Sequence, residues 1–174
     1  MPFNDLFFSP NPKAKKTITI SSNKLTFFSA LIFSLILNAK IWQIYFDYFQ
    51  LDSFLQLAQA ICFFLFIYFL LVSIFSFFSL PWLQKTFLTI IFLLSCPAMY
   101  FALAYGTFYD TTMLQNVLET DQREAFELIS DSFLIVTIFT GLIPCIIIYK
   151  SKITYDVFWK QVSKNIALML ISLP

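Results

Sequence analysis

Residues 55–80 read LQLAQAICFFLFIYFLLVSIFSFFSL, an apolar run without Asp, Glu, Lys or Arg. A helix needs about 20 predominantly apolar residues to cross the hydrocarbon core of a bilayer. The run therefore predicts a membrane-spanning helix. Pro81 should stop this helix, because proline has no backbone N–H for the helical hydrogen-bond ladder.

Four further apolar runs lie on either side of this segment. The last opens near Val162, breaks off at Pro174 and is too short to cross a bilayer as a straight helix. It is either re-entrant or, as we prefer, the start of a helix that continues past Pro174. We therefore expect an all-α integral membrane protein, a five-transmembrane-helix bundle with a truncated fifth helix. Its transmembrane domain is residues 25–174, with spans at about 25–45, 55–80, 87–105, 133–149 and 162–174.

Composition excludes several other classes of protein. Of the 174 residues, 59% are apolar and 12% are charged, whereas soluble domains carry roughly a quarter charged residues. The chain has no His, two Gly and a net charge of +1, which argue against Gly-rich phosphate loops and nucleic-acid binding. The three cysteines lie far apart within apolar runs, where we expect buried free thiols and no metal site in this chain.

The basic residues predict the orientation of the chain in the membrane. Lys and Arg concentrate in the cytoplasmic loops of membrane proteins. On the predicted spans, nine of the eleven Lys and Arg fall on one side. This side should be the cytoplasm, so residues 1–24 form a cytoplasmic N-terminal tail and the C-terminus points outward. The nine residues are Lys13, Lys15, Lys16, Lys24, Lys85, Lys150, Lys152, Lys160 and Lys164.

The segment between the third and fourth spans, residues 106–132, is the only long polar stretch after the N-terminal tail. Asp110 can cap one short helix. Asp121 can cap a second, with Glu124 at the capping-box spacing. Apolar residues recur at helical spacing in both halves. We expect one or two short amphipathic helices at the outer membrane interface.

Asn116, Thr120 and Glu124 follow one another at intervals of four residues, so on a helix they share one face. Their amide, hydroxyl and carboxylate suit a zwitterionic lipid head group. The carboxylate faces the ammonium, and the amide and hydroxyl donate to phosphate oxygens. Arg123 can also reach a phosphate. From spacing alone, a merely solvated helix face is the stronger interpretation.

The same segment resembles a known family. Tyr105-Gly106, the run DTTMLQNVL from Asp110 to Leu118, and then Thr120, Asp121 and Glu124 resemble the signature of the lipid A phosphoethanolamine transferases. This family includes the mobile colistin resistance enzymes. The sequence GLIP at 141–144 is similar as well. The resemblance covers about residues 25–174, which corresponds to the family's N-terminal transmembrane domain.

The resemblance implies a function. Such enzymes move phosphoethanolamine from phosphatidylethanolamine to lipid A in the inner membrane of Gram-negative bacteria, which gives polymyxin resistance. Chemistry takes place in a periplasmic catalytic domain with zinc and a Thr nucleophile. Nothing in this chain matches that domain, so the chain alone should be inactive and hold no cofactor. It should anchor the enzyme and help to bind the donor lipid through Asn116, Thr120, Glu124 and Arg123.

Two other functions compete with this one. A non-catalytic membrane scaffold or interaction protein would show the same apolar spans. A small transporter usually needs ionisable groups near the middle of the membrane or broken helices in matched halves, and the spans hold almost no such groups.

Overall fold

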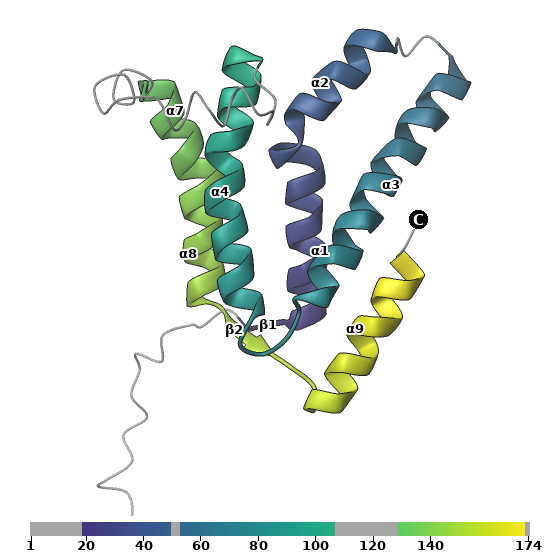
Figure 1. Ribbon diagram of the computed structural model, residues 1–174, viewed down its shortest axis with the longest axis vertical. Coiled ribbons are helices and arrows are strands. Elements are labelled where there is room, and N and C mark those ends of the chain that lie inside the picture. The colour runs from purple at the N-terminus through teal and green to yellow at the C-terminus, as the bar shows by residue number, and fades with distance from the viewer. Residues whose placement is uncertain (1–18, 50–52, 107–128, 173–174) are drawn as a thin grey trace, which may run out of the picture.

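A computed structural model describes residues 19–49, 53–106 and 129–172 of the chain, and these are mostly helical (Figure 1). The helices form an elongated bundle. The turn between the second and third long helices lies at one end. The helices, with π-helical segments marked η, are α1 (Ser22–Ile32), η2 (Phe33–Leu37), α2 (Ala39–Tyr48), α3 (Phe54–Phe77), α4 (Gln84–Tyr105), α7 (Asp131–Val136), η3 (Thr137–Leu142), α8 (Ile143–Lys150) and α9 (Phe158–Ser172).

Three of the predicted spans are confirmed as helices long and apolar enough to cross a membrane. These are α3, α4 and the continuous α7–η3–α8 helix, residues 131–150. A fourth span is present if α1–η2 and α2 are taken as one bent helix. The helix α9 covers 15 residues, so the described part of the chain holds three or four spans. The expected count of five is not reached in these residues.

The first predicted span, residues 25–45, is not one straight helix. Its axis bends by 52° between η2 and α2. The amide N–H of Asn38 donates to the Phe33 carbonyl at 3.0 Å, five residues back, instead of to the Ser34 carbonyl as in an α-helix. The Trp42 indole donates to that Ser34 carbonyl at 2.6 Å. The bend is therefore stabilised by a side chain that takes over a backbone hydrogen bond.

The structure also corrects the all-α prediction at one point. Strand β1 (Thr19–Ser21) pairs in parallel with β2 (Lys152–Thr154), so that Ile20 lies opposite Ile153. Both isoleucines pack against the buried core. Part of the predicted N-terminal tail therefore belongs to the folded domain, and α1 begins at Ser22.

The core lies where α1–η2, α3 and α4 meet. The ring of Phe33 contacts Phe75 and Phe92 edge to face, with centroids 5.1 and 4.7 Å apart. All three side chains are at most 4% exposed. Such aromatic pairs contribute about 0.5–1.5 kcal/mol beyond the area they bury. They fix α1 between the two long spans.

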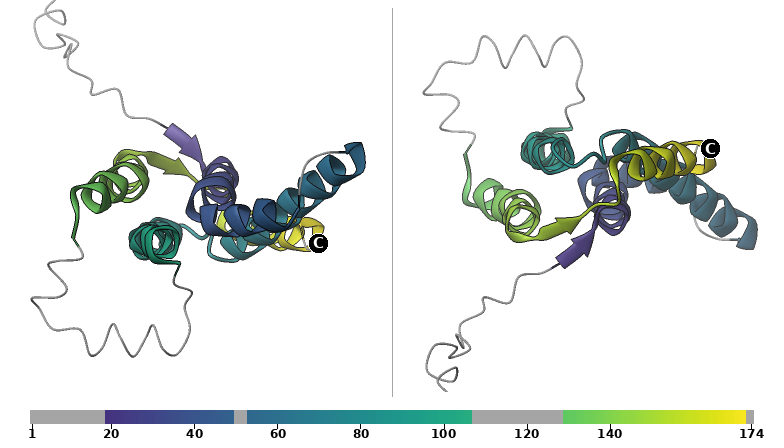
Figure 2. Two further views of the ribbon diagram at one scale, coloured as in Figure 1. Left: turned by 90° about the horizontal axis from the view of Figure 1, so that it is seen from above. Right: turned by 90° about the horizontal axis from the view of Figure 1, so that it is seen from below.

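Two further helix pairs complete the bundle. Figure 2 shows α9 running along α3 and the α7–η3–α8 helix beside α4. At the second contact a Cβ on Gly141 would lie 3.2 Å from the Cβ of Cys96, so glycine permits this close approach. Cys96 and Cys145 are buried, as expected, but Cys62 is exposed on α3.

Candidate functional site

The lipid-binding residues predicted from sequence are Asn116, Thr120, Arg123 and Glu124. All four lie outside the described residues, as do both predicted amphipathic helices. The structure instead describes the two positions at which the chain enters and leaves segment 107–128. These positions are the ends of α4 and α7.

The entry to the segment is fixed by Gly106. This residue follows the last turn of α4 with φ at +66°, in the left-handed region. Glycine adopts this conformation without a steric penalty, which is why it so often ends a helix. No atom lies within 4 Å of a Cβ built there. The glycine is therefore needed for the backbone angle and not for space.

The exit is fixed by a cap on α7. The hydroxyl of Ser130 accepts from the backbone N–H of Phe133 at 3.2 Å. It also lies 2.7 Å from the hydroxyl of Tyr100 on α4. The rings of Tyr100 and Phe101 both pack against Phe133, with centroids 5.2 and 5.5 Å apart. These contacts hold the two helix ends together at the end of the bundle opposite the β-sheet (Figure 1).

Charges divide between the two ends of the bundle. Six of the seven lysines in the described residues belong to elements near the β-sheet or lead into them: Lys24, Lys85, Lys150, Lys152, Lys160 and Lys164. Asp47 and Asp131 lie in α2 and α7, at the opposite end. The end that frames segment 107–128 is thus the less basic one.

A cluster of buried polar side chains, which sequence reasoning missed, lies at the sheet end. Gln84, at the start of α4, is 1% exposed. Its carbonyl oxygen accepts from the Ser22 hydroxyl at 2.9 Å. Its amide donates to the Ser22 carbonyl and to the Thr26 hydroxyl, both at 3.0 Å. The Ser79 hydroxyl lies 2.5 Å from that of Ser22, and it must donate, because Ser22 already donates to Gln84.

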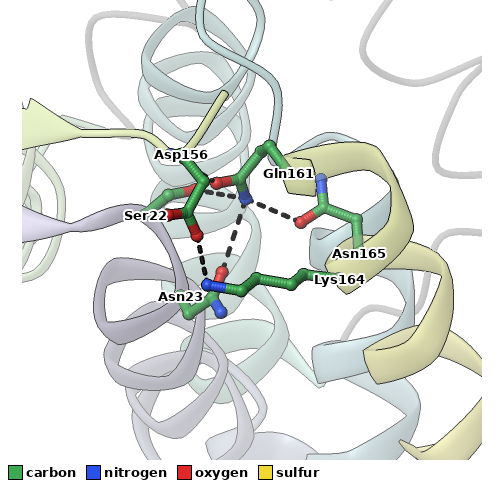
Figure 3. Close-up of polar contacts among 6 residues, drawn as sticks. All are labelled: Ser22, Asn23, Asp156, Gln161, Lys164 and Asn165. Carbon is green, nitrogen blue, oxygen red and sulfur yellow. Dashed lines mark hydrogen bonds and ion pairs between the residues drawn. The ribbon is translucent and has the colours of Figure 1, made fainter. Parts of the chain in front are cut away.

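The helix α9 extends this cluster (Figure 3). The Gln161 amide donates to Asn165 at 2.8 Å and to Ser22 and Asn23 at 3.4 Å. The Asn165 amide donates to the Ser79 carbonyl at 2.8 Å. The cluster therefore joins α1, the α3–α4 turn, α4 and α9. A usable sequence signal was the i, i+4 spacing of Ser22 with Thr26 and of Gln161 with Asn165.

A polar cleft of about 330 Å³ opens beside this cluster. Lys164 and Asp156 form an ion pair at its edge. The hydrogen bond from Lys164, together with the charges of Lys164 and Lys160, lowers the pKa of Asp156 below its ordinary value. The cleft is lined by Ser21, Ser22, Asn23, Thr154, Tyr155, Asp156, Gln161 and Lys164.

Tyr155 supplies a testable feature of this cleft. Its hydroxyl is buried and has no hydrogen-bond partner among the described residues, and burial raises its pKa to about 12 from an ordinary value of about 10. The folded state thus binds the proton more tightly than the unfolded state. The resulting contribution to stability is complete below pH 10 and is lost as the pH rises to 12.

The variant Tyr155→Phe should lose less stability than the parent chain between pH 10 and 12. At neutral pH its free energy of unfolding should rise by about 1 kcal/mol, because an unpartnered buried hydroxyl is removed. Thermal unfolding in detergent across this pH range measures both effects. The matched control is Tyr149→Phe, at a side chain that is 79% exposed. Identical pH profiles of the Tyr155→Phe variant and the parent would contradict the assignment.

Comparison with known proteins identifies the family to which this helical bundle belongs. The family model described as phosphoethanolamine transferase EptA/EptB matches residues 67–174. This chain belongs to that family. Its match begins within α3 and includes α4, the α7–η3–α8 helix, α9 and the segment that joins α4 to α7.

Relatives of this transferase membrane domain are much longer proteins. Phosphatidylethanolamine transferase Mcr-1 of Escherichia coli is 34% identical over 95 residues, which cover 55% of this chain and 18% of that protein. Mcr-2 of Escherichia coli is 31% identical over 101 residues, with 55% and 19% covered. Phosphoethanolamine transferase EptA of Salmonella typhimurium is 27% identical over 81 residues, with 47% and 15% covered. The chain thus spans less than a fifth of these relatives.

A solved structure confirms the fold of the membrane domain. The integral membrane protein lipooligosaccharide phosphoethanolamine transferase A from Neisseria meningitidis superposes with a TM-score of 0.83 at 22% identity. The superposition covers 90% of this chain and 29% of that one. The chain is therefore a multi-pass membrane domain of the transferase family.

The described part of this membrane domain offers no metal centre. Within residues 19–49, 53–106 and 129–172, no three His, Cys, Asp or Glu side chains lie close enough together to hold a metal ion.

Proposed function

We propose that this chain is the membrane domain of an enzyme that transfers phosphoethanolamine from phosphatidylethanolamine to lipid A and so gives polymyxin resistance. The observation that carries the proposal is the family match over residues 67–174, together with the names of the relatives, which specify phosphatidylethanolamine and phosphoethanolamine transfer. The domain anchors the enzyme, and its catalytic partner is a periplasmic domain with zinc.

The donor lipid binds along segment 107–128 in this proposal. Asn116 and Thr120 donate to the phosphate of phosphatidylethanolamine, Glu124 accepts from its ammonium, and Arg123 adds a second contact to the phosphate. Support comes from the ends of the segment. Gly106 and Ser130 start and finish it at one end of the bundle, where α4 and α7 are held together.

The proposed orientation is N-terminus in the cytoplasm and C-terminus towards the periplasm, in the bacterial inner membrane. The concentration of lysines at the sheet end supports it, because cytoplasmic loops carry the excess of Lys and Arg. The opposite end, which frames segment 107–128, then faces the periplasm. A periplasmic catalytic domain meets its lipid donor at that surface.

The test is expression of the complete protein in a polymyxin-sensitive Gram-negative host. We expect lipid A to gain phosphoethanolamine, read by mass spectrometry, and polymyxin to bind less well. Residues 1–174 expressed alone are the matched control and should leave lipid A unchanged. Phosphoethanolamine on another envelope glycan instead of lipid A would overturn the assignment of lipid A as the acceptor. No transfer to any acceptor would overturn the enzyme assignment in favour of a non-catalytic membrane scaffold.

A further inference from the structure

An apolar groove lies beside the bend in the first span. It has a volume of about 400 Å³ and runs between the α1–α2 bend and α3. Ligand pockets in proteins usually measure about 300–1,000 Å³. The groove-lining residues are Leu35, Ala39, Trp42, Phe46, Ala60, Ile61 and Phe64.

The shape of the groove is built into the bend. Ala39 and Ala60 contribute only methyl groups, so α2 and α3 leave space between them. Trp42 forms a wall whose orientation is fixed by its hydrogen bond to the Ser34 carbonyl. The indole also packs on the rings of Phe63 and Phe64, with centroids 5.7 and 6.0 Å apart. The wall of the groove is therefore held in place by contacts within the chain.

The position of the groove indicates a hydrocarbon occupant. It is lined partly by α3, which is long and apolar enough to cross the bilayer. The side chains of Leu35, Phe46 and Ile61 on its rim are 49%, 47% and 51% exposed. At this depth their surroundings are lipid chains and not water. An acyl chain can therefore enter from the side.

A positive charge lies next to the groove. Lys40 and Gln43 directly follow the groove-lining residues Ala39 and Trp42, so they occupy the adjoining strip of α2. The Lys40 ammonium donates to Gln43 at 3.0 Å. It forms no ion pair with an acidic side chain of the described ranges. It lies in the first turn of α2, where the helix dipole adds positive potential.

We propose that this groove binds one acyl chain of a phospholipid, with the lipid phosphate at Lys40. A charge near hydrocarbon is expensive unless it is paired, and a lipid phosphate supplies the counter-charge where the acyl chain ends. The proposal is independent of the donor function, because its residues are in η2, α2 and α3 and none is in segment 107–128. It assigns a second lipid site to the domain.

The chain contains its own reporter for this site. Its three tryptophans are Trp42, Trp82 and Trp159. The last two are 93% and 78% exposed, so Trp82→Phe with Trp159→Phe leaves Trp42 as the single tryptophan of the 174-residue chain, and excitation at its red edge avoids the tyrosines. This variant is reconstituted in vesicles of digalactosyldiacylglycerol, a host lipid without a phosphate. Phosphatidylglycerol brominated on its acyl chains is then added as quencher.

We expect half-maximal quenching of Trp42 at a quencher fraction about tenfold below that for random lipid contact, a preference of about 1.4 kcal/mol. Ala60→Leu fills the groove and should make quenching proportional to the quencher fraction. Ala104→Leu adds the same volume to an exposed position on α4 and should change nothing. Proportional quenching in the parent, or an unchanged Ala60→Leu variant, would overturn the proposal.

The role of Lys40 is tested separately, without filling the groove. Brominated diacylglycerol has the same acyl chains as the phospholipid but no phosphate, so it should quench about tenfold less effectively. Lys40→Gln should abolish this difference between the two quenchers. Equal quenching by both lipids in the parent chain would overturn the assignment of the phosphate to Lys40. If Ala60→Leu fails to fold, this second measurement still tests the proposed lipid site.

Discussion

Replacing Asn116 and Glu124 together by alanine in the complete protein should reduce phosphoethanolamine transfer by about 10²-fold or more. Each residue is proposed to make a charge-assisted hydrogen bond to the donor head group, and such bonds contribute about 1.5–3 kcal/mol. The loss of two is therefore about 3–6 kcal/mol, and every 1.36 kcal/mol is tenfold in rate. The assay is the fraction of lipid A that carries phosphoethanolamine.

The double variant should still reach the membrane in normal amount, because both residues belong to the polar segment that joins α4 to α7 in the sequence. Gln122→Ala is the matched control. Gln122 is in the same segment but off the four-residue repeat of Asn116, Thr120 and Glu124, so transfer should stay within about twofold of the parent. Arg123→Ala should fall between the two, since Arg123 is proposed to contact only the phosphate. Full activity of the double variant would show that this face does not bind the donor.

The membrane spans were predictable because they depend on a property of single segments. Residues 55–80 and 87–105 exclude charge over the length that a bilayer requires, and α3 and α4 agree with these ranges within three residues at each end. The bend at Asn38 was not predictable. It depends on which group donates a hydrogen bond to the Ser34 carbonyl, and that group is the Trp42 side chain, eight residues away. Hydropathy carries no information on that choice.

The candidate site also has a part that could be predicted from the sequence and a part that could not. The pattern of Asn116, Thr120 and Glu124 can be read from the sequence, because a spacing of four residues predicts one shared helix face, and it stays a prediction. The buried cluster around Gln84 is not visible, because its partners Ser22 and Thr26 are about 60 residues away in sequence. The pairing of β1 with β2 joins segments still further apart. In these cases only the tertiary fold distinguishes a buried polar residue from a solvated one.

The second large effect is expected at Gln84. Gln84→Leu should lower the free energy of unfolding by about 2–4 kcal/mol. The change removes three hydrogen bonds. Each buried polar group left without a partner costs about 1–3 kcal/mol. Thr26, whose hydroxyl loses its hydrogen bond to Gln84, is only 1% exposed. Thermal unfolding in detergent micelles measures the loss.

The controls separate hydrogen bonding from the change of side-chain shape. Gln59→Leu makes the same substitution at an exposed position on α3 and should alter stability by no more than about 0.5 kcal/mol. Adding Ser22→Ala and Thr26→Ala to Gln84→Leu also removes the two stranded hydroxyls, so that of the former partners of Gln84 only the Ser22 backbone carbonyl remains. Removing all partners of a buried hydrogen bond is nearly neutral compared with removing one. The triple variant should therefore be more stable than Gln84→Leu alone. If it is less stable, the side chains act by filling space, and the hydrogen bonds do not hold α1 to α4.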